Sequence, residues 1–106
     1  MYTIKYWYEH GGGCLWSADE ITVSKFGNLI DYHLLDLSAS TIESISMLET
    51  QYATYLDWNN PAAPSTWSRE KKNKFLTEAT KTYYKIVEDL GETYTVINML
   101  YLSIPS

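Results

Sequence analysis

The side-chain types that support catalysis or metal binding are few in this chain. It contains one cysteine, Cys14, and two histidines, His10 and His33. A nucleophilic thiol needs a histidine and an orienting acid such as Asp31 within hydrogen-bond reach, and no sequence spacing brings these residues together. A zinc site needs four ligands, so the cysteine and histidines would have to be joined by carboxylates. We therefore expect no catalytic residue, no metal and no cofactor, and we interpret Cys14 as a buried, inert thiol.

Two further motifs have simple structural interpretations. Gly11, Gly12 and Gly13 are not followed by the lysine and hydroxyl residue of a phosphate-binding loop, so they predict a turn. Asp19 and Glu20 would serve acid–base chemistry only if burial shifted their pKa values, and adjacent acids in a turn are normally solvated. We therefore assign no chemistry to either motif.

The distribution of charge limits the classes of partner. The 106 residues include 13 acidic and 8 basic side chains, for a net charge of −5. Residues 1–65 hold eight of the acids and only two lysines, so the negative charge is concentrated there. A negative surface repels phosphate and attracts basic proteins, which argues against nucleic acid as a partner. The alternative is that the charge only keeps a small protein soluble.

Composition also suggests a compartment. The first six residues lack the apolar run of a signal peptide, and no segment approaches the roughly 18–20 apolar residues of a membrane helix. A single cysteine cannot form an internal disulfide, and small domains without disulfides are typical of reducing compartments. We expect a cytoplasmic protein that does not enter the membrane.

The chain length predicts a single domain over residues 1–106. Alternating apolar residues predict a first strand over 2–8, and residues 14–17 would be the returning strand of a hairpin. Residues 21–23 could extend a strand, and the turn signals around 29–37 favour a third one. Residues 94–102 are apolar on both faces, which predicts a last strand that is buried on both sides or covered by a partner.

Two helices are expected between these strands. Residues 40–43 match a capping box, and apolar residues at helical spacing continue to residue 55 or 56, although Glu49 interrupts the edge of the apolar stripe. Ser68 would cap a second helix over Arg69–Leu90, which Gly91 would end. The prediction is an α+β fold. Its antiparallel-rich sheet has three N-terminal strands and a C-terminal strand, and both helices pack on one face.

The connection between the helices, residues 57–67, contains two tryptophans. Trp58 and Trp67 either pack against the helices or form an exposed aromatic rim with Asp57, and aromatic anchors of this kind dominate many interfaces. The second helix starts with a basic cluster, which is Arg69, Lys71, Lys72 and Lys74. This cluster is either a solvated helical turn or a patch for an acidic partner.

Three segments resemble a known family: YLDWNNP at 55–61, PSTWS at 64–68 and DLGETYTV at 89–96. They resemble small bacterial immunity proteins of contact-dependent growth inhibition and polymorphic toxin systems, and they cover mainly the C-terminal half. The resemblance implies a cytoplasmic protein that binds one cognate toxin domain and blocks its active site or substrate path. It carries over no catalytic residue. Many such toxins are nucleases, whose basic surfaces would attract an acidic inhibitor.

The residues expected to contact the toxin are Glu9, Asp19, Glu20, Asp31, Asp36, Asp57 and Trp58. Two other functional classes stay open at this point. A small enzyme or ligand-binding domain would bring at least two of His10, Cys14 and His33 together with an acid in a pocket. A structural or adaptor subunit would pair with a second copy through its last strand. The identity of the toxin, the face that binds it and the oligomeric state do not follow from the sequence.

Overall fold

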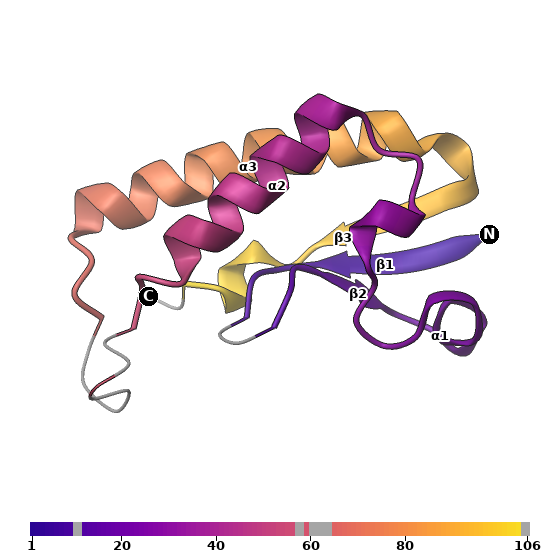
Figure 1. The fold of residues 1–106 in the computed structure, drawn as a ribbon, viewed down its shortest axis with the longest axis horizontal. Helices are drawn as coiled ribbons and strands as arrows, with labels where there is room; N and C mark the ends of the chain where they lie inside the picture. The colour runs from indigo at the N-terminus through magenta and orange to yellow at the C-terminus, as the bar shows by residue number, and fades with distance from the viewer. Residues whose placement is uncertain (10–11, 57–58, 60–64, 105–106) are drawn as a thin grey trace.

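The structure is a computed structural model that describes residues 1–9, 12–56, 59 and 65–104 (Figure 1). In these residues the fold is α+β, with a three-stranded mixed sheet and three α-helices. The elements in chain order are β1 (Tyr2–Tyr6), β2 (Leu15–Ser17), α1 (Glu20–Phe26), η1 (Tyr32–Leu34), α2 (Ala39–Tyr52), α3 (Arg69–Leu90), η2 (Gly91–Thr93), β3 (Tyr94–Asn98) and η3 (Leu100–Leu102), where η marks a 3-10 helix. None of the helices in the described ranges has the length and apolar composition needed to cross a membrane.

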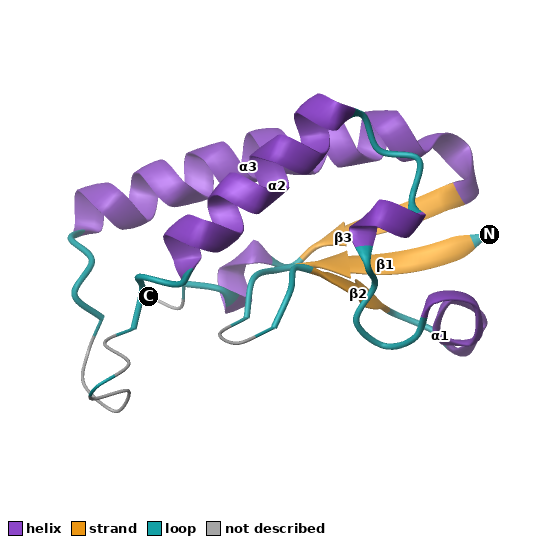
Figure 2. Ribbon diagram, in the orientation of Figure 1, coloured by secondary structure: helices purple, strands orange, loops and turns teal. Residues whose placement is uncertain are grey.

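β1 is the central strand of the sheet, whose order is β2-β1-β3. It pairs antiparallel with β2, with Tyr6 opposite Leu15, which confirms the predicted pairing of the first two strands. It pairs parallel with β3, with Tyr2 opposite Tyr94, because α3 returns the chain to the end of the sheet where β1 begins (Figure 2). The prediction of an antiparallel-rich sheet of four strands is therefore wrong.

The predicted strand over residues 29–37 is absent. Leu29 forms a single bridge with Trp16, and the chain then turns into η1. Asp31 starts this turn, because its carboxylate accepts a hydrogen bond from the backbone amide of His33. An aspartate that bonds its own backbone in this way competes with strand pairing, and the turn signals on either side of the segment did not reveal it.

The predicted strand over residues 21–23 is also wrong, because these residues lie in α1. Asp19 caps this helix, since its Oδ1 accepts hydrogen bonds from both the backbone amide and the hydroxyl of Thr22. Gly27 ends the helix at a φ of 82°, a conformation that favours glycine. The capping interaction outweighs the β propensity of a short β-branched run.

The two long helices occur in the predicted order. The bounds of the first differ from those predicted, and the second agrees with its prediction. Ser38 caps α2, two residues before the predicted capping box, and the helix ends at Tyr52, earlier than predicted. α3 has the predicted bounds, because the Ser68 hydroxyl accepts a bond from the Lys71 amide and Gly91 ends the helix at a φ of 69°.

The last strand is shorter than predicted. β3 ends at Asn98, whose side chain accepts a hydrogen bond from the amide of Leu100 and so starts η3. Only Val96 is buried in this strand, and Ile97 is 42% exposed. Burial on both faces, the first of the two alternatives predicted for this strand, is therefore wrong, and cover by a partner stays a prediction.

The core lies between the sheet and the pair α2 and α3, which cover one face of it as predicted (Figure 2). Ile4, Tyr6 and Tyr8 point into this core from alternate positions, as the first strand predicted. The Tyr6 hydroxyl donates a hydrogen bond to the carbonyl of Ala79 in α3 at 3.0 Å and lies 2.9 Å from the Tyr8 hydroxyl. Burial of these phenols is tolerated because both have partners.

The position of Trp67 decides between the two alternatives given for it, packing against the helices or an exposed aromatic rim. Trp67 is 6% exposed, its ring packs on those of Tyr55 and Phe75, and its indole nitrogen donates to the Thr54 hydroxyl at 2.9 Å. Trp67 is therefore a core residue. Trp58 lies outside the described residues.

A polar contact joins the start of α2 to the end of α3. Asp89 Oδ2 accepts hydrogen bonds from the Ser38 amide at 3.0 Å and from the Thr41 hydroxyl at 2.6 Å. Thr41 is fully buried, so its hydroxyl depends on this carboxylate and on the Ser38 hydroxyl.

Replacing Thr41 with valine keeps the shape of the side chain and removes this contact. Because hydrogen bonds to charged groups contribute about 1.5–3 kcal/mol, Thr41→Val is expected to lower the free energy of unfolding by that amount in urea titrations. Thr50→Val, at an exposed position of the same helix, is the control and is expected to change it by less than about 0.5 kcal/mol. Equal losses in the two variants would contradict the role of Asp89.

Candidate functional site

The acids that the sequence singles out are exposed wherever the structure describes them. They belong to the hairpin end, the start of α1, the cap of η1 and the segment before α2, and they are Glu9, Asp19, Glu20, Asp31 and Asp36. Asp57 and Trp58 lie outside the described residues. The exposed acids come from four separate segments, and two of them, Asp19 and Glu20, line a hollow of about 460 Å³ at the start of α1 together with Ser17, Ala18, Val23 and Ser24.

Two of these acids already have local partners. The hydrogen bonds from the Thr22 hydroxyl and amide hold the pKa of Asp19 below its usual range. The pKa of Asp31 is lowered by the His33 amide and then by the His33 side chain, whose Nδ1 lies 3.0 Å from Asp31 Oδ1. Both carboxylates therefore stay ionised at neutral pH, and both help to fix the backbone that carries them.

A groove of about 370 Å³ lies where the hairpin, the segment before η1 and α2 meet. The residues that line it include Gly13, Cys14, Leu29, Asp31, Tyr32 and Glu49. We refer to it as the Glu49 groove. It brings one predicted contact residue, Asp31, beside an acid of α2 that the sequence did not mark as functional. The one sequence feature that could have pointed to Glu49 was its position at the edge of the apolar stripe of its helix.

Glu49 is the half-buried carboxylate of this groove. The Tyr32 hydroxyl donates a hydrogen bond to its Oε1 at 3.0 Å. Among the described residues, no nitrogen of a lysine, arginine or histidine lies within 4.0 Å of its carboxylate. Burial raises the pKa of Glu49, and the Tyr32 hydrogen bond and then the charge of His33 oppose this rise without cancelling it. The groove thus contains a carboxylate that makes no direct ion pair with the described part of the chain, although His33 acts on it from a greater distance.

The thiol and the imidazole of His33 do not form a catalytic pair. Cys14 is 1% exposed, and burial raises the pKa of its thiol, which disfavours the reactive thiolate. His33 is exposed, bonds Asp31 and is not among the residues that line the groove. His10 lies outside the described residues. Within the described ranges, no three His, Cys, Asp or Glu side chains are grouped so that they could hold a metal ion.

A comparison with protein families identifies the chain. It matches the family described as Serratia CdiI immunity protein-like over residues 2–101, which include every strand and α-helix of the fold. The chain belongs to this family. The match extends the resemblance from the C-terminal half to almost the whole sequence. No curated protein matches the chain at a significant level.

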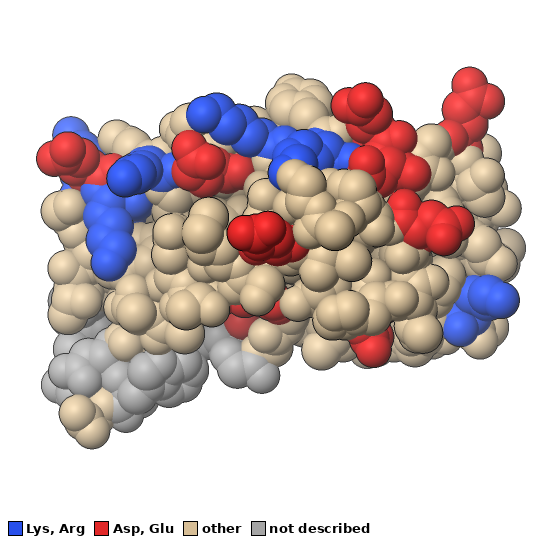
Figure 3. All heavy atoms as spheres, turned by 45° about the horizontal axis from the view of Figure 1, so that its top comes forward, with Lys and Arg blue, Asp and Glu red and all other residues tan. Residues whose placement is uncertain are grey.

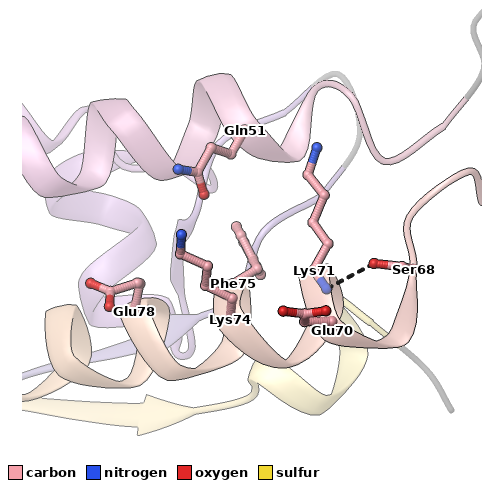
Figure 4. Close-up of a pocket in the computed structure, with 7 residues that line it drawn as sticks. All are labelled: Gln51, Ser68, Glu70, Lys71, Lys74, Phe75 and Glu78. Atoms are coloured by element: carbon pink, nitrogen blue, oxygen red, sulfur yellow. Dashed lines mark hydrogen bonds between the residues drawn. The ribbon is translucent and has the colours of Figure 1, made fainter.

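This CdiI-like chain has a second groove, between the end of α2 and the start of α3. It measures about 410 Å³ and is lined by Gln51, Ser68, Glu70, Lys71, Lys74, Phe75 and Glu78 (Figure 4). Two lysines and two glutamates balance its charge, and Lys71 Nζ lies 5.0 Å from the centre of the Trp67 ring. The groove therefore has no preference for a partner of either charge.

The charges of this CdiI-like chain are unevenly distributed along its helical face (Figure 3). The basic side chains follow α3 from its start through Lys81 and Lys85, and Glu88, Asp89 and Glu92 follow at its end. Two hollows combine apolar side chains with carboxylates and have no lysine or arginine among the described residues that line them: the Glu49 groove and the hollow at the start of α1. The carboxylates of the α1 hollow, Asp19 and Glu20, are exposed, whereas Glu49 is half-buried.

The face of the sheet away from α2 and α3 carries an aromatic pair that sequence patterns did not single out. The rings of Trp7 and Trp16 lie 5.6 Å apart, and the Trp16 indole nitrogen donates to the Trp7 carbonyl at 3.1 Å. Both side chains are half-buried. The pair stiffens the hairpin that forms one wall of the Glu49 groove.

The raised pKa of Glu49 predicts how its replacement changes stability. A carboxyl whose folded pKa exceeds its ordinary value of about 4.5 makes the protein lose stability as pH rises through that interval. Glu49→Gln is therefore expected to increase the free energy of unfolding at pH 7 and to have little effect below pH 4. Urea titrations between pH 4 and pH 7 measure the difference.

Tyr32→Phe provides the matched test of the same carboxylate. It removes the hydrogen bond that favours the ionised form, so the loss of stability with rising pH is expected to become steeper. If neither variant alters the pH profile of the wild-type protein, Glu49 is not held in the partly buried position described.

Proposed function

We propose that this protein is the immunity protein of a contact-dependent growth inhibition system that binds and neutralises one cognate toxin domain in the cytoplasm. The observation that carries the proposal is the family match over residues 2–101. The protein acts as an inhibitor by occupying the toxin, and it performs no chemistry of its own. The buried Cys14 thiol, whose pKa is raised by burial, and the pairing of His33 with Asp31 support this part of the proposal.

The proposed toxin is a nuclease with a basic surface. Residues 1–65 carry eight acids and two lysines, and the acids proposed as contacts are exposed where they are described. A nuclease must attract phosphate, so its active-site surface is positive. Carboxylates on the inhibitor would be drawn to that surface and would compete there with nucleic acid. Nucleic acid itself is not a partner in this proposal.

Co-expression with the toxin domain encoded beside the gene tests the function. We expect the two proteins to purify together and expect cells that make the immunity protein to survive toxin production. An unrelated toxin domain serves as the control and should neither purify with the protein nor be neutralised. If the adjacent toxin neither binds nor loses its toxicity, the proposal is wrong.

Charge reversal tests the proposed electrostatic attraction. Glu20 and Asp36 suit this test better than Asp19, whose replacement would also remove the cap of α1. The double variant Glu20→Lys/Asp36→Lys is expected to associate with the toxin about tenfold more slowly at low salt, with a smaller change in dissociation. The difference should shrink as salt screens the charges.

The matched control changes the net charge equally toward the start of α3, away from the Asp36 end of the molecule, where Asp89 bonds Ser38. Glu70→Lys/Glu78→Lys is expected to slow association less, because these acids lie outside the proposed contact set. Stopped-flow association rates over a salt series measure both variants. Equal slowing in both, or rates independent of salt, would show that the acids of the first two-thirds do not guide binding.

A further inference from the structure

The Glu49 groove has the chemistry of a receptor for a long basic side chain. Leu29, which is 45% exposed, and the ring of Tyr32 provide apolar surface along it, and Glu49 and Asp31 provide carboxylates. The side chains of arginine and lysine have the matching form, since an apolar stem carries a charged head. A guanidinium also forms paired hydrogen bonds with a carboxylate and stacks on aromatic rings.

The Glu49 carboxylate has unused capacity for hydrogen bonds. An ionised carboxylate has about four acceptor positions, and Tyr32 is the one side chain in the described part of the chain that donates to it. Partial burial of a charge without an opposite charge is unfavourable. An incoming cation would therefore gain an acceptor that is already partly desolvated and held in place by the Tyr32 hydroxyl.

No basic residue of the described part of the chain lines the groove, and His33, which bonds Asp31, is directed to that carboxylate and makes no ion pair with Glu49. Lys71 and Lys72 lie over aromatic rings near the start of α3, and Lys85 bonds the hydroxyls of Ser40 and Ser44. The described residues that line the groove include no lysine or arginine. Charge complementarity thus favours a cation supplied by another molecule.

We propose that the Glu49 groove anchors one basic side chain of the cognate toxin domain, for which arginine is the best fit. This inference rests on the proposed function and specifies where the partner is held. The dispersed exposed acids speed the approach of the toxin, whereas the groove holds one of its side chains after contact. Anchors in partly desolvated pockets act mainly on dissociation, and exposed charges act mainly on association.

The test uses Glu49→Gln and the toxin domain encoded beside the gene. Glutamine keeps the size of the side chain and can still accept the hydrogen bond from Tyr32, but it lacks the charge. Loss of one charged hydrogen-bonded contact is expected to weaken binding about 10- to 100-fold, mostly through faster dissociation. Surface plasmon resonance measures both rate constants, and circular dichroism checks that the variant is folded.

Glu43→Gln is the matched control. It removes the same charge from the same helix, and it lies on a different face because six residues do not complete whole helical turns. It is expected to change the dissociation rate less than about twofold, since exposed charges contribute little once a complex has formed. The contrast between the two variants separates anchoring from a general effect of net charge.

A double-mutant cycle identifies the partner side chain. Each surface arginine and lysine of the toxin is replaced by glutamine and measured against both wild-type protein and Glu49→Gln. One basic residue is expected to lose most of its effect when Glu49 is already replaced. If wild-type protein binds but Glu49→Gln binds equally well, or if no basic residue couples to Glu49, the anchor is wrong while the proposed function stands. If the wild-type protein does not bind the toxin, both are wrong.

Discussion

The fold depends on the burial of the inner side of β1 against the two long helices. Tyr6 and Tyr8 place phenol hydroxyls inside the core, where each polar group needs a partner. Tyr6 finds one in the carbonyl of Ala79, which fixes α3 over the strand. The backbone amide of Tyr8, just after β1, donates to the Ser103 hydroxyl, and the Tyr52 hydroxyl donates to the Ser103 carbonyl, so the segment after β3 is held against the end of the first hairpin strand and α2.

This arrangement also places the Glu49 groove. With Tyr52 held in the core beside the ring of Tyr8, the preceding turn of α2 carries Glu49 toward the hairpin. The cap formed by Asp31 turns the chain so that Tyr32 reaches the Glu49 carboxylate. The groove therefore depends on long-range packing, because Cys14, Tyr32 and Glu49, which line it, come from three separate segments of the sequence.

Local patterns predicted the elements that local interactions determine. α3 has the bounds that Ser68 and Gly91 indicated, and the inner face of β1 follows its alternation of side chains. The predictions failed where a polar side chain competes with strand pairing, as Asp19 and Asp31 do. Strand direction could not be predicted, because a long helix leaves both directions open for the strand that follows it. Glu49 was visible only as an irregularity in an apolar stripe, since its meaning depends on residues far from it in sequence.

We propose that the protein holds its toxin through the Glu49 carboxylate, which pairs with no lysine or arginine of the described part of the chain. The most direct measurement is a crystal structure of the complex with the toxin domain encoded beside the gene. The account predicts a toxin arginine or lysine nitrogen within 4 Å of the Glu49 carboxylate, as ion pairs require, with the Tyr32 hydrogen bond retained. A complex in which the Glu49 groove faces solvent, and the toxin rests on another surface, would contradict it.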